Sequence, residues 1–504
     1  MQGKVYIIGA GPGTYKLLTL RAVECIKRAD VIVYDRLIDS KVLSFASQEA
    51  KLINVGKHPT FHQVPQKEIN HIIKNLAKEG KIVARVKGGD CFLFGRGGEE
   101  CEYLHQHGVK YEVIPGVSSS LAVPAYAGIP VTHRNYASSV HIITGHKSAD
   151  KEGMQFDFET LAKVEGTLVF LMGIKNMNEI CSGLLQYGKS GDTPVAIIEK
   201  GASADQRVIT GILSKIIEIG IQQKVTSPAV IVIGEVASLS EKLDWFNKGI
   251  LSGKRIVVTR PSEQAHELVD ALEELGATVI EYPVIKIKPM EHYHRLEEAL
   301  QRIKEFSWLV FTSVNGVTMF FDQLKQLQKD VRILHGLKFA VVGTATKKAL
   351  EEKGIYADFV PLQFTTAHLC EGLVEKVQQG EKLLLLRSEI AGEELQAGLK
   401  KHNIDFENIA IYKTVENRVE SSKLPDMLDS NMIDYVLFTS PSTVEAYRSL
   451  FGEERMKQSA PQYVCIGPVT AKAAREAGLI VSGVSEEFVH EGIIKKLLEL
   501  SGSE

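Results

Sequence analysis

Cysteine is scarce in this sequence, and no two cysteines have the spacing of a metal-binding or redox pair. The six cysteines in 504 residues lie far apart: Cys25, Cys91, Cys101, Cys181, Cys370 and Cys465. Without a Cys-x-x-Cys pair, neither a disulfide scaffold nor a thiolate zinc site is expected. The loosely clustered histidines also lack companion ligands at metal-binding spacing. We therefore expect free thiols, no metal and a reducing compartment.

Long hydrophobic runs and an excess of one charge are absent as well. No run of about 18 or more apolar residues occurs, which argues against a membrane-spanning helix. The formal net charge is only −3, which gives no reason to expect nucleic acid or an anionic membrane as a partner. The first residues, MQGKVYIIGAGPG, lead directly into a strand-like segment and do not resemble a signal peptide. These features predict a cytoplasmic protein.

The pattern of apolar residues predicts an α/β protein with largely parallel sheets. Strand-like runs such as KVYIIGA, VIVYD and TLVFLMG alternate with helical patterns along the whole chain. A chain of 504 residues is too long for one core, and domains of roughly 100–200 residues predict three or four compact units. The major boundary is expected near residues 240–253, where a helical stretch ends in Ser-Gly-Lys before the strand RIVVTR.

The second half of the chain contains an internal repeat. LVFTSVNGVTMFF at 309–321 resembles YVLFTSPSTVEAY at 435–447, and FAVVGTATKKALEEKGI at 339–355 resembles YVCIGPVTAKAAREAGL at 463–479. Two motifs in the same order at nearly the same separation predict two similar lobes. Each motif is a strand that opens directly into a helix, and such a junction offers N–H groups and a helix dipole to carboxylates or phosphates. A cleft between the lobes would then hold an anion, although each junction alone could be an ordinary helix cap.

A glycine-rich loop, Gly9 to Gly13, follows the first predicted strand. The dinucleotide-binding spacing G-x-G-x-x-G would need glycine in place of Thr14, and Pro12 removes an N–H from the turn. Asp35 closes the second strand, where a dinucleotide-binding fold would hold a ribose hydroxyl. A nicotinamide-dependent oxidoreductase is therefore one interpretation of the first half.

A second interpretation comes from eight motifs that occur in order across about residues 3–240: VYIIGAGPG, VIVYDRL, RVKGGDCFLFGRGGEE, VIPGVSSSLAVPAYAGIPVTHR, HIITGH, TLVFLMG, TPVAIIEKG and SPAVIVIGEV. This set resembles the uroporphyrinogen III methyltransferases of the tetrapyrrole methylase family. The resemblance implies a methylase over residues 1–245, with subdomains at about 1–114 and 115–245, that binds S-adenosyl-L-methionine at their junction. It also implies a homodimer formed through this half. Cys91 stands where the family usually has proline, so that loop is expected to be less rigid.

The same resemblance assigns residues to the cofactor and to the chemistry. The residues implied for S-adenosylmethionine are Pro12, Gly88, Gly89, Asp90, Leu93, Ser118, Ser119, Met172 and Gly201. Glycines let the backbone approach a ligand closely, and Asp90 can compensate a cationic group. The implied proton acceptor is Asp35 and the implied proton donor is Lys57, both of types whose pKa responds to the surroundings.

Three arginines lie in the same motifs and are candidates for binding the peripheral carboxylates of the substrate. They are Arg36, Arg96 and Arg134. An arginine can bind a carboxylate through two parallel hydrogen bonds, but each of the three could instead form a structural ion pair.

From residue 253 to 504 the chain looks like uroporphyrinogen III synthase, with TRP at 259–261 followed in family order by FTSVNGV, VVGTAT, LLLLRSE, IAIYKT, FTSPSTV and IGPVTA. The resemblance implies that two α/β lobes hold hydroxymethylbilane, which loses its hydroxyl as the ring closes with ring D inverted. Tyr412 is implied to help the hydroxyl leave by donating a hydrogen bond. The candidate substrate-binding residues are the hydroxyl donors Thr312, Ser313, Thr346, Ser440, Ser442 and Thr470 and the counter-charges Arg260 and Lys413.

Together the two resemblances imply a bifunctional enzyme of sirohaem or cobalamin synthesis. The C-terminal half would make uroporphyrinogen III, and the N-terminal half would methylate it at carbons 2 and 7 with two S-adenosylmethionine to give precorrin-2. Alignment of an electron-rich pyrrole carbon with the methyl group should matter most for that step. In an alternative interpretation, the C-terminal half is a non-catalytic tetrapyrrole-binding module that serves the methylase.

Overall fold

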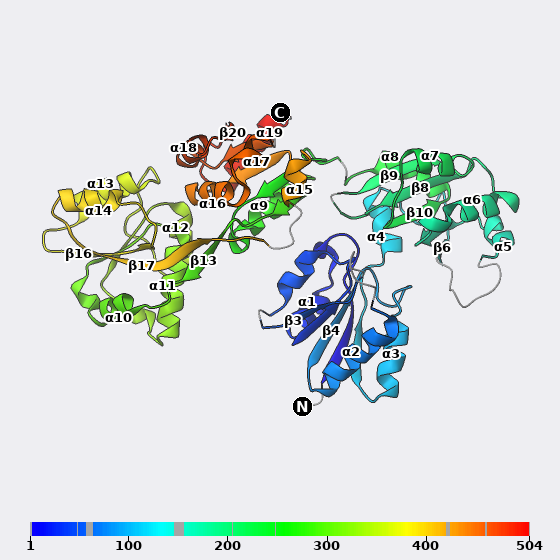
Figure 1. Cartoon of the computed structure of the whole chain (residues 1–504), viewed down its shortest axis with the longest axis horizontal. Helices are drawn as coiled ribbons and strands as arrows, with labels where there is room; N and C mark the ends of the chain where they lie inside the picture. Colours follow the sequence, from blue (N-terminus) through cyan, green and yellow to red (C-terminus); the bar gives the residue numbers. More distant parts are fainter. Residues whose placement is uncertain are drawn as a thin grey trace. The chain divides into compact units, whose positions relative to one another are not determined.

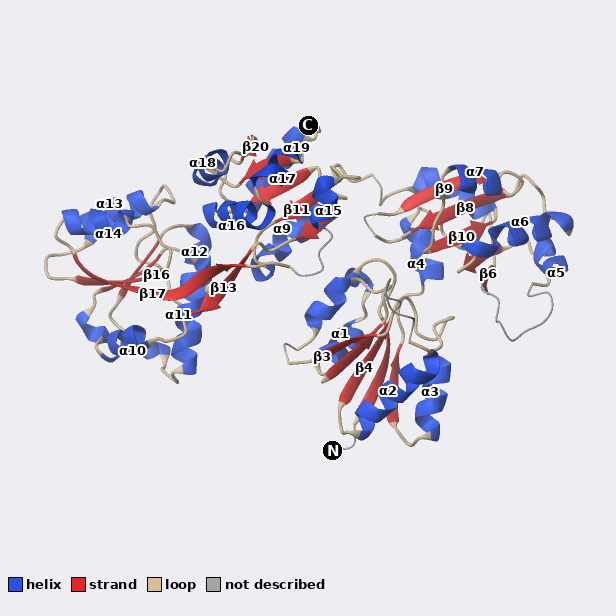
Figure 2. Ribbon diagram, in the orientation of Figure 1, coloured by secondary structure: helices blue, strands red, loops and turns tan. Residues whose placement is uncertain are grey.

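The computed structural model describes the chain in eight stretches, residues 3–47, 49–56, 64–145, 156–203, 205–246, 248–419, 424–458 and 461–502. The chain divides into two compact units, residues 1–254 with 272–278 and residues 255–271 with 279–504, and both are drawn in Figure 1. Each unit contains two five-stranded sheets, and Figure 2 shows helices packed around the sheets. The predicted α/β class is therefore confirmed. Every helix among the described residues is too short or too polar to span a bilayer.

The first sheet is wholly parallel, in the order β3-β2-β4-β1-β5. Its strands are β1 (Lys4–Gly9), β2 (Val31–Tyr34), β3 (Lys51–Asn54), β4 (Ile82–Lys87) and β5 (Lys110–Ile114). Its helices are α1 (Leu20–Lys27), α2 (Gln66–Lys78) and α3 (Gly97–Gln106), with 3-10 helices at Tyr15–Leu17 and Ser40–Phe45. Alternate side chains of β1 enter two separate cores, Ile7 on the face of α2 and Ile8 on the face of α1. Both faces are thus covered, and the carboxyl ends of the strands meet at one edge, where α/β proteins bind ligands.

The second sheet is mixed, in the order β6-β7-β10-β8-β9. Its strands are β6 (Val140–Thr144), β7 (Thr167–Leu171), β8 (Pro194–Glu199), β9 (Arg207–Ile212) and β10 (Ala229–Ile233). Its helices are α4 (Ser119–Tyr126), α5 (Phe158–Lys163), α6 (Met177–Gln186), α7 (Ile216–Gln222) and α8 (Ser240–Leu243), with 3-10 helices at Ile174–Asn176 and Glu235–Leu239. Only β6 and β7 pair in parallel here, so this sheet departs from the expectation of largely parallel pairing. The short connection between β8 and β9 explains part of this, because a parallel crossover needs a dozen or more residues.

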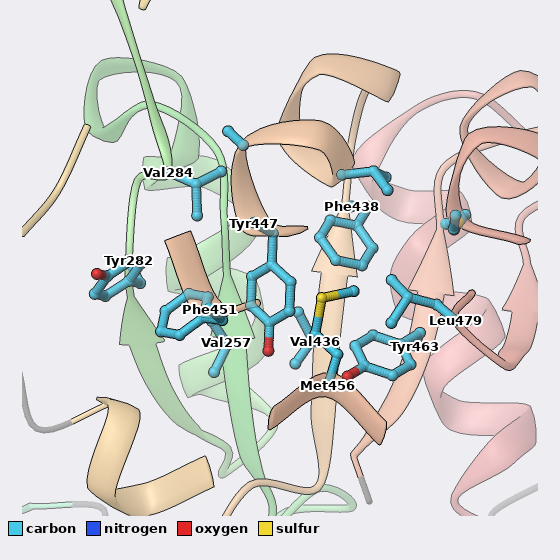
Figure 3. Packing of buried hydrophobic residues seen from close by; sticks show 14 of the residues in the cluster. Val257, Tyr282, Val284, Val436, Phe438, Tyr447, Phe451, Met456, Tyr463 and Leu479 are labelled. Atoms are coloured by element: carbon cyan, nitrogen blue, oxygen red, sulfur yellow. The ribbon is translucent and has the colours of Figure 1, made fainter. Parts of the chain in front are cut away.

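The first sheet of the second unit has the order β12-β11-β18-β19-β20, and we call it with its helices the first lobe. Its strands are β11 (Arg255–Val258), β12 (Thr278–Glu281), β18 (Tyr435–Phe438), β19 (Gln462–Cys465) and β20 (Val481–Val484). Its helices are α9 (Ser262–Glu274), α15 (Leu424–Asp429), α16 (Pro441–Phe451), α17 (Glu453–Gln458), α18 (Pro468–Glu476) and α19 (His490–Leu500). Tyr447 of α16 packs edge-on against Phe438 of β18, with ring centroids 5.3 Å apart, in the core that Figure 3 shows.

The remaining sheet has the order β13-β17-β16-β14-β15 and forms the second lobe. Its strands are β13 (Ile285–Pro289), β14 (Trp308–Phe311), β15 (Lys338–Val341), β16 (Lys382–Ser388) and β17 (Asp405–Glu416). Its helices are α10 (His294–Gln301), α11 (Val314–Gln326), α12 (Thr344–Glu351), α13 (Thr366–Lys376) and α14 (Glu394–Lys401), with 3-10 helices at Ile303–Glu305 and Val331–Leu334. The chain enters this lobe through β13 and leaves it through β17, and these two strands pair antiparallel.

The two lobes share one topology, as the internal repeat predicts. The order β12-β11-β18-β19 in the first lobe corresponds to β17-β16-β14-β15 in the second. The repeated motifs are β14 with α11 and β15 with α12 in the second lobe, and β18 with α16 and β19 with α18 in the first. Each lobe therefore presents two matched junctions between a strand and a helix at the carboxyl ends of neighbouring parallel strands.

Candidate active sites

Three turns meet closely at the carboxyl edge of the first sheet. Gly11 and Gly89 exchange backbone hydrogen bonds of 2.9 and 3.1 Å, which join the turn after β1 to the turn after β4. A Cβ atom added to Gly9 would lie 2.6 Å from the backbone nitrogen of Gly116, in the turn after β5. Only glycine permits such an approach, so the cluster explains in physical terms why these turns are rich in glycine. Pro12 and Gly89 are buried in this cluster, and Gly88 is half-buried.

Asp90 ties two of these turns together through its carboxylate. Oδ1 accepts hydrogen bonds from the N–H groups of Phe92 and Leu93, each at 2.8 Å, and Oδ2 accepts one from Gly116 at 3.1 Å. A carboxylate has about four acceptor sites, so these bonds leave roughly one for a ligand. Asp90 therefore orders the loop as well as supplying negative charge.

Helix α4 begins beside the same turns. Ser118 is its N-cap, and its side chain accepts a hydrogen bond from the N–H of Ser120 at 3.2 Å. Ser118 and Ser119 are both half-buried, and Ser119 is the first residue of the helix. The free N–H groups of a first helical turn favour negative or hydrogen-bond-accepting groups.

Gly201, in the loop after β8, also reaches this region from the second sheet. A Cβ atom on Gly201 would collide with the side chain of Val123 in α4, and one on Gly13 would collide with the carbonyl of Ala202. The loops after β1 and β8 therefore touch within the first unit. Gln206 fixes the second loop by accepting from the N–H of Ala202 at 2.8 Å.

Met172 follows β7 in a left-handed backbone conformation, with φ 57° and 51% of its surface exposed. Its backbone lies next to Gly145, at the end of β6. The predicted cofactor residues in the turns after β1 and β4, at the start of α4 and in the loop after β8 thus lie in contacting segments. Met172, at the carboxyl end of β7, takes no part in those contacts.

Asp35 lies directly after β2, and Arg85 holds its carboxylate from below the surface. Arg85 Nη2 donates to Asp35 Oδ1 at 2.7 Å, and the two side chains are 2% and 31% exposed. Arg85 Nε also donates to Glu100 Oε1 at 3.2 Å, and Lys87 Nζ donates to the same oxygen at 2.8 Å. Two buried cations thus balance a buried and a half-exposed carboxylate, which keeps Asp35 in one position with an exposed edge.

The predicted proton donor and the three candidate substrate-binding arginines of the methylase half lie in different surroundings. Lys57 lies outside the described residues. Arg36 and Arg134 are exposed. Arg96 is exposed and pairs with Glu99 at 2.7 Å, and this carboxylate raises the pKa of the guanidinium.

In the second lobe, the side chains of Tyr412, on β17, and Ser313, after β14, are in contact at the carboxyl edge of the sheet. The Tyr412 hydroxyl lies 2.9 Å from Ser313 Oγ, which also caps α11 by accepting from the N–H of Gly316 at 3.1 Å. Tyr412 is only 6% exposed, and burial raises the pKa of its phenol. Because Ser313 Oγ already accepts the Gly316 N–H, it can donate its own proton to Tyr412 or accept from it. Burial therefore favours the neutral phenol, and Ser313 holds the hydroxyl of Tyr412 next to the end of β14.

The remaining predicted hydroxyls divide into half-buried and buried groups. Thr312, before the α11 cap, is half-buried, as are Ser440 and Ser442, whose Oγ atoms lie 2.9 Å apart at the start of α16. Thr346 in α12 and Thr470 in α18 occupy matching helical positions and are almost fully buried. The structure therefore brings Ser313 to Tyr412, and it places the two threonines within the packed first turns of their helices.

The two predicted counter-charges of the synthase-like half have different surroundings. Arg260 follows β11, and burial lowers the pKa of its guanidinium while Glu267 acts in the opposite direction. Lys413 Nζ pairs with Glu291 Oε1 at 2.7 Å, which raises the pKa of the lysine. Lys413 is thus already engaged by a carboxylate of its own lobe.

Sequence reasoning missed Arg85 and Glu100, which hold Asp35 in place, and it missed Arg387. The signal was present for the arginines, because each interrupts a run of buried strand residues, in KIVARVKGG and KLLLLRSE. A charged side chain in such a run is buried and needs a partner. Which partner it has depends on distant segments, since Glu100 belongs to α3.

Comparisons with known proteins agree with the two-part organisation. Residues 4–217 match the family of tetrapyrrole (corrin/porphyrin) methylases, and residues 266–495 match uroporphyrinogen-III synthase HemD. The chain is 40% identical over 502 residues to porphyrin biosynthesis protein HemD of Ruminiclostridium josui, covering 99% of this chain and 98% of the relative. It is 37% identical to the uroporphyrinogen-III C-methyltransferase of Bacillus subtilis, over 93% of this chain and 92% of the relative. Its first half is 49% identical to the S-adenosyl-L-methionine-dependent uroporphyrinogen III methyltransferase of Methanosarcina barkeri, over 49% of this chain and 97% of the relative.

Proposed function

The chain belongs to the family in which a tetrapyrrole methylase is followed by a uroporphyrinogen-III synthase, and on that premise we propose how its residues act. It is a bifunctional enzyme of sirohaem or cobalamin synthesis. The C-terminal half cyclises hydroxymethylbilane to uroporphyrinogen III, and the N-terminal half methylates that product to precorrin-2. The methylase match includes the Gly9 loop, so the alternative of a nicotinamide-dependent oxidoreductase is not supported. We assign residues 1–245 to the methylase, with subdomains at about 1–114 and 115–245, and residues 253–504 to the synthase.

We propose that S-adenosylmethionine binds where the turns after β1 and β4, the start of α4 and the loop after β8 converge. The observation that carries this assignment is the close contact of the Gly9, Gly89 and Gly116 turns, which leaves no room for side chains between the three backbone segments. When bound there, the cofactor supplies an electrophilic methyl group. Asp90 keeps two of the turns in register, and Ser118 orders the start of α4.

Asp35 is proposed to accept the proton that the methylated pyrrole carbon releases. Its carboxylate is fixed by Arg85 on one side and remains partly exposed on the other, which suits a base that must meet a substrate. The pair also limits how far the carboxylate can move, so the base is positioned before the substrate arrives. Lys57 is the proposed proton donor, as the sequence motif suggests.

Tyr412 is proposed to donate a hydrogen bond to the hydroxyl that leaves hydroxymethylbilane. Its phenol is neutral because burial raises its pKa, and Ser313 holds it at the carboxyl edge of the second lobe. A neutral phenol can stabilise the departing oxygen, and the same site needs no nucleophile. Thr312 and Ser440, at matched junctions of the two lobes, and Arg260, after β11, are proposed to bind carboxylates of the bilane.

We also propose that the protein forms a homodimer through the methylase half and works in the cytoplasm. The family resemblance supports the first statement, and six free, buried thiols suit a reducing compartment. Light scattering of the whole chain and of variants altered in the methylase half would test the dimer.

An anaerobic assay of the whole chain with hydroxymethylbilane and S-adenosylmethionine tests both activities together. We expect a dimethylated type III product, identified by mass and absorbance after oxidation. Methylation that occurs only when uroporphyrinogen III is added would leave the C-terminal half as a binding module. No methylation under either condition would contradict the proposal.

A further inference from the structure

Arg387 is a buried cation with two unpaired nitrogen atoms. It lies at the end of β16, is 3% exposed, and its Nη2 donates to the carbonyl of Gly392 at 2.8 Å. Its Nε and Nη1 have no hydrogen-bond partner in the part of the chain that the structure describes, and no carboxylate is among the groups that shift its pKa. A guanidinium stays charged at any physiological pH, and a buried charge without a counter-ion is costly. A carboxylate bound to Nε and Nη1 would offset that cost.

The position of Arg387 is repeated in the first lobe. In the second lobe β16 pairs with β14, and in the first lobe β11 pairs with β18, where β14 and β18 are the strands of the repeated motif. The repeat aligns Val310 of β14 with Leu437 of β18, and these residues pair with Leu385 and Val258, respectively. Leu385 therefore corresponds to Val258, and two residues later Arg387 corresponds to Arg260. Burial lowers the pKa of both guanidinium groups. Each lobe thus has an arginine at the carboxyl end of the strand next to its hydroxyl-bearing junction, and this arginine is half-buried in the first lobe and buried in the second.

The two arginines differ in their surroundings. Arg260 has the carboxylate of Glu267 among its neighbours, whereas Arg387 lies near the phenol of Tyr412 on the adjacent strand β17. The loop after β16 contacts the Arg387 guanidinium, because the carbonyl of Gly392 accepts a hydrogen bond from Nη2. A ligand that reaches Arg387 therefore also comes near the residue proposed to assist the leaving hydroxyl.

We propose that Arg387 binds a carboxylate of the linear tetrapyrrole through Nε and Nη1, next to Tyr412 in the second lobe. The inference rests on the proposed synthase function of this half. The arginine supplies the charge that fixes one acidic side chain of the bilane, so that the end of the bilane carrying the hydroxyl is held near Tyr412. It acts on binding, and the chemistry of ring closure remains with the groups at Tyr412.

The test compares Arg387→Met and Arg387→Lys with Arg332→Met in the full chain. Arg332 belongs to the same lobe, is highly exposed, and pairs with Asp330 at the surface, so its replacement controls for loss of one positive charge. We expect Arg387→Met to raise KM for hydroxymethylbilane about tenfold or more and to change kcat far less, with Arg387→Lys between it and the wild type. Arg332→Met should leave both constants unchanged.

A second readout is the binding of uroporphyrin III, a stable octacarboxylate, measured by quenching of its fluorescence. Because the methylase half also binds this class of tetrapyrrole, the titration is fitted to two sites. One of the two Kd values should rise by a similar factor in Arg387→Met, and both should stay the same in Arg332→Met. Equal KM and Kd in all three variants would overturn the proposal. If Arg387→Met does not fold, as judged by thermal melting, the comparison of Arg387→Lys with Arg387→Gln decides, because only the first keeps the charge. A wild-type chain that binds uroporphyrin III through Arg387 but cyclises nothing would refute the synthase function and leave the anion site in place.

Discussion

Arg85 Nη2 donates to Asp35 Oδ1 at 2.7 Å, so a side chain buried in the middle of the first sheet fixes a carboxylate at its edge. The other side of the same guanidinium is held by Glu100 of α3. The position of the proposed base is therefore set by residues that never reach the substrate.

Replacement of Arg85 by Met should damage both stability and methylation. Asp35 would lose its partner, while Glu100 would keep Lys87, so we expect a loss of about 3 kcal/mol, the lower end of the range for breaking a buried pair. Urea unfolding followed by tryptophan fluorescence in a Trp308→Phe background measures this loss of stability, because the remaining tryptophan, Trp245, then reports on the first unit alone. The matched control is Arg21→Met, whose pair with Glu112 lies at the surface, is screened by solvent and should change the free energy of unfolding far less. Equal losses in the two variants would contradict the buried role.

Replacement of Asp35 by Asn should remove methylation and keep the synthase. Loss of a general base typically costs about 10²–10⁴ in rate, and the amide cannot accept the proton. The measurement is single-turnover methyl transfer to supplied uroporphyrinogen III, with cyclisation of hydroxymethylbilane by the same sample as the internal control. Unchanged methyl transfer would exclude Asp35 as the base.

Replacement of Gly9 by Ala should abolish cofactor binding with little effect on the C-terminal half. The added methyl group would lie 2.6 Å from the backbone of Gly116, and backbone cannot move aside cheaply. Gly98→Ala is the matched control, because nothing lies within 4 Å of its added atom. Calorimetric titration with S-adenosylhomocysteine should show a loss of affinity for the first variant only. Binding that survives in Gly9→Ala would place the cofactor elsewhere.

Replacement of Tyr412 by Phe should slow cyclisation about 10- to 100-fold, since one hydrogen bond to the leaving oxygen is lost. The pKa of this phenol is raised, so the neutral form is favoured and the wild-type rate should not fall through phenolate formation as pH approaches 10. The same shift stabilises the fold below the unfolded pKa of about 10, and this stabilisation is lost as pH rises through the folded pKa. Spectroscopic titration of phenolate in the wild type and the variant measures the difference. A tyrosine at this position that ionises at its ordinary pKa would contradict the buried geometry.

The native protein should resist thiol reagents. All six cysteines are buried, and burial raises the pKa of Cys91 and of Cys181 to about 12, so almost no thiolate exists at pH 8. An aromatic disulfide reagent should detect no thiols in the folded protein and six after denaturation in guanidinium. Rapid reaction of one thiol in the folded state would show that a core opens locally.

The sequence alone determined the α/β class, the two similar lobes and the family motifs, because strand periodicity, turn glycines and repeated segments are local features. Gly9 to Gly13, Asp35 and Tyr412 could be selected from such motifs by themselves. The mixed pairing of the second sheet could not, since an apolar run of five residues looks the same in a parallel and an antiparallel neighbourhood. Only the tertiary structure decided that Arg85 meets Asp35, that Ser313 meets Tyr412 and that Arg387 has unpaired nitrogens. Arg85 and Asp35 are 50 positions apart in the sequence, and Ser313 and Tyr412 are 99 apart. Contacts between residues so distant in the sequence, and the lack of a partner for Arg387, follow from how the strands and helices pack.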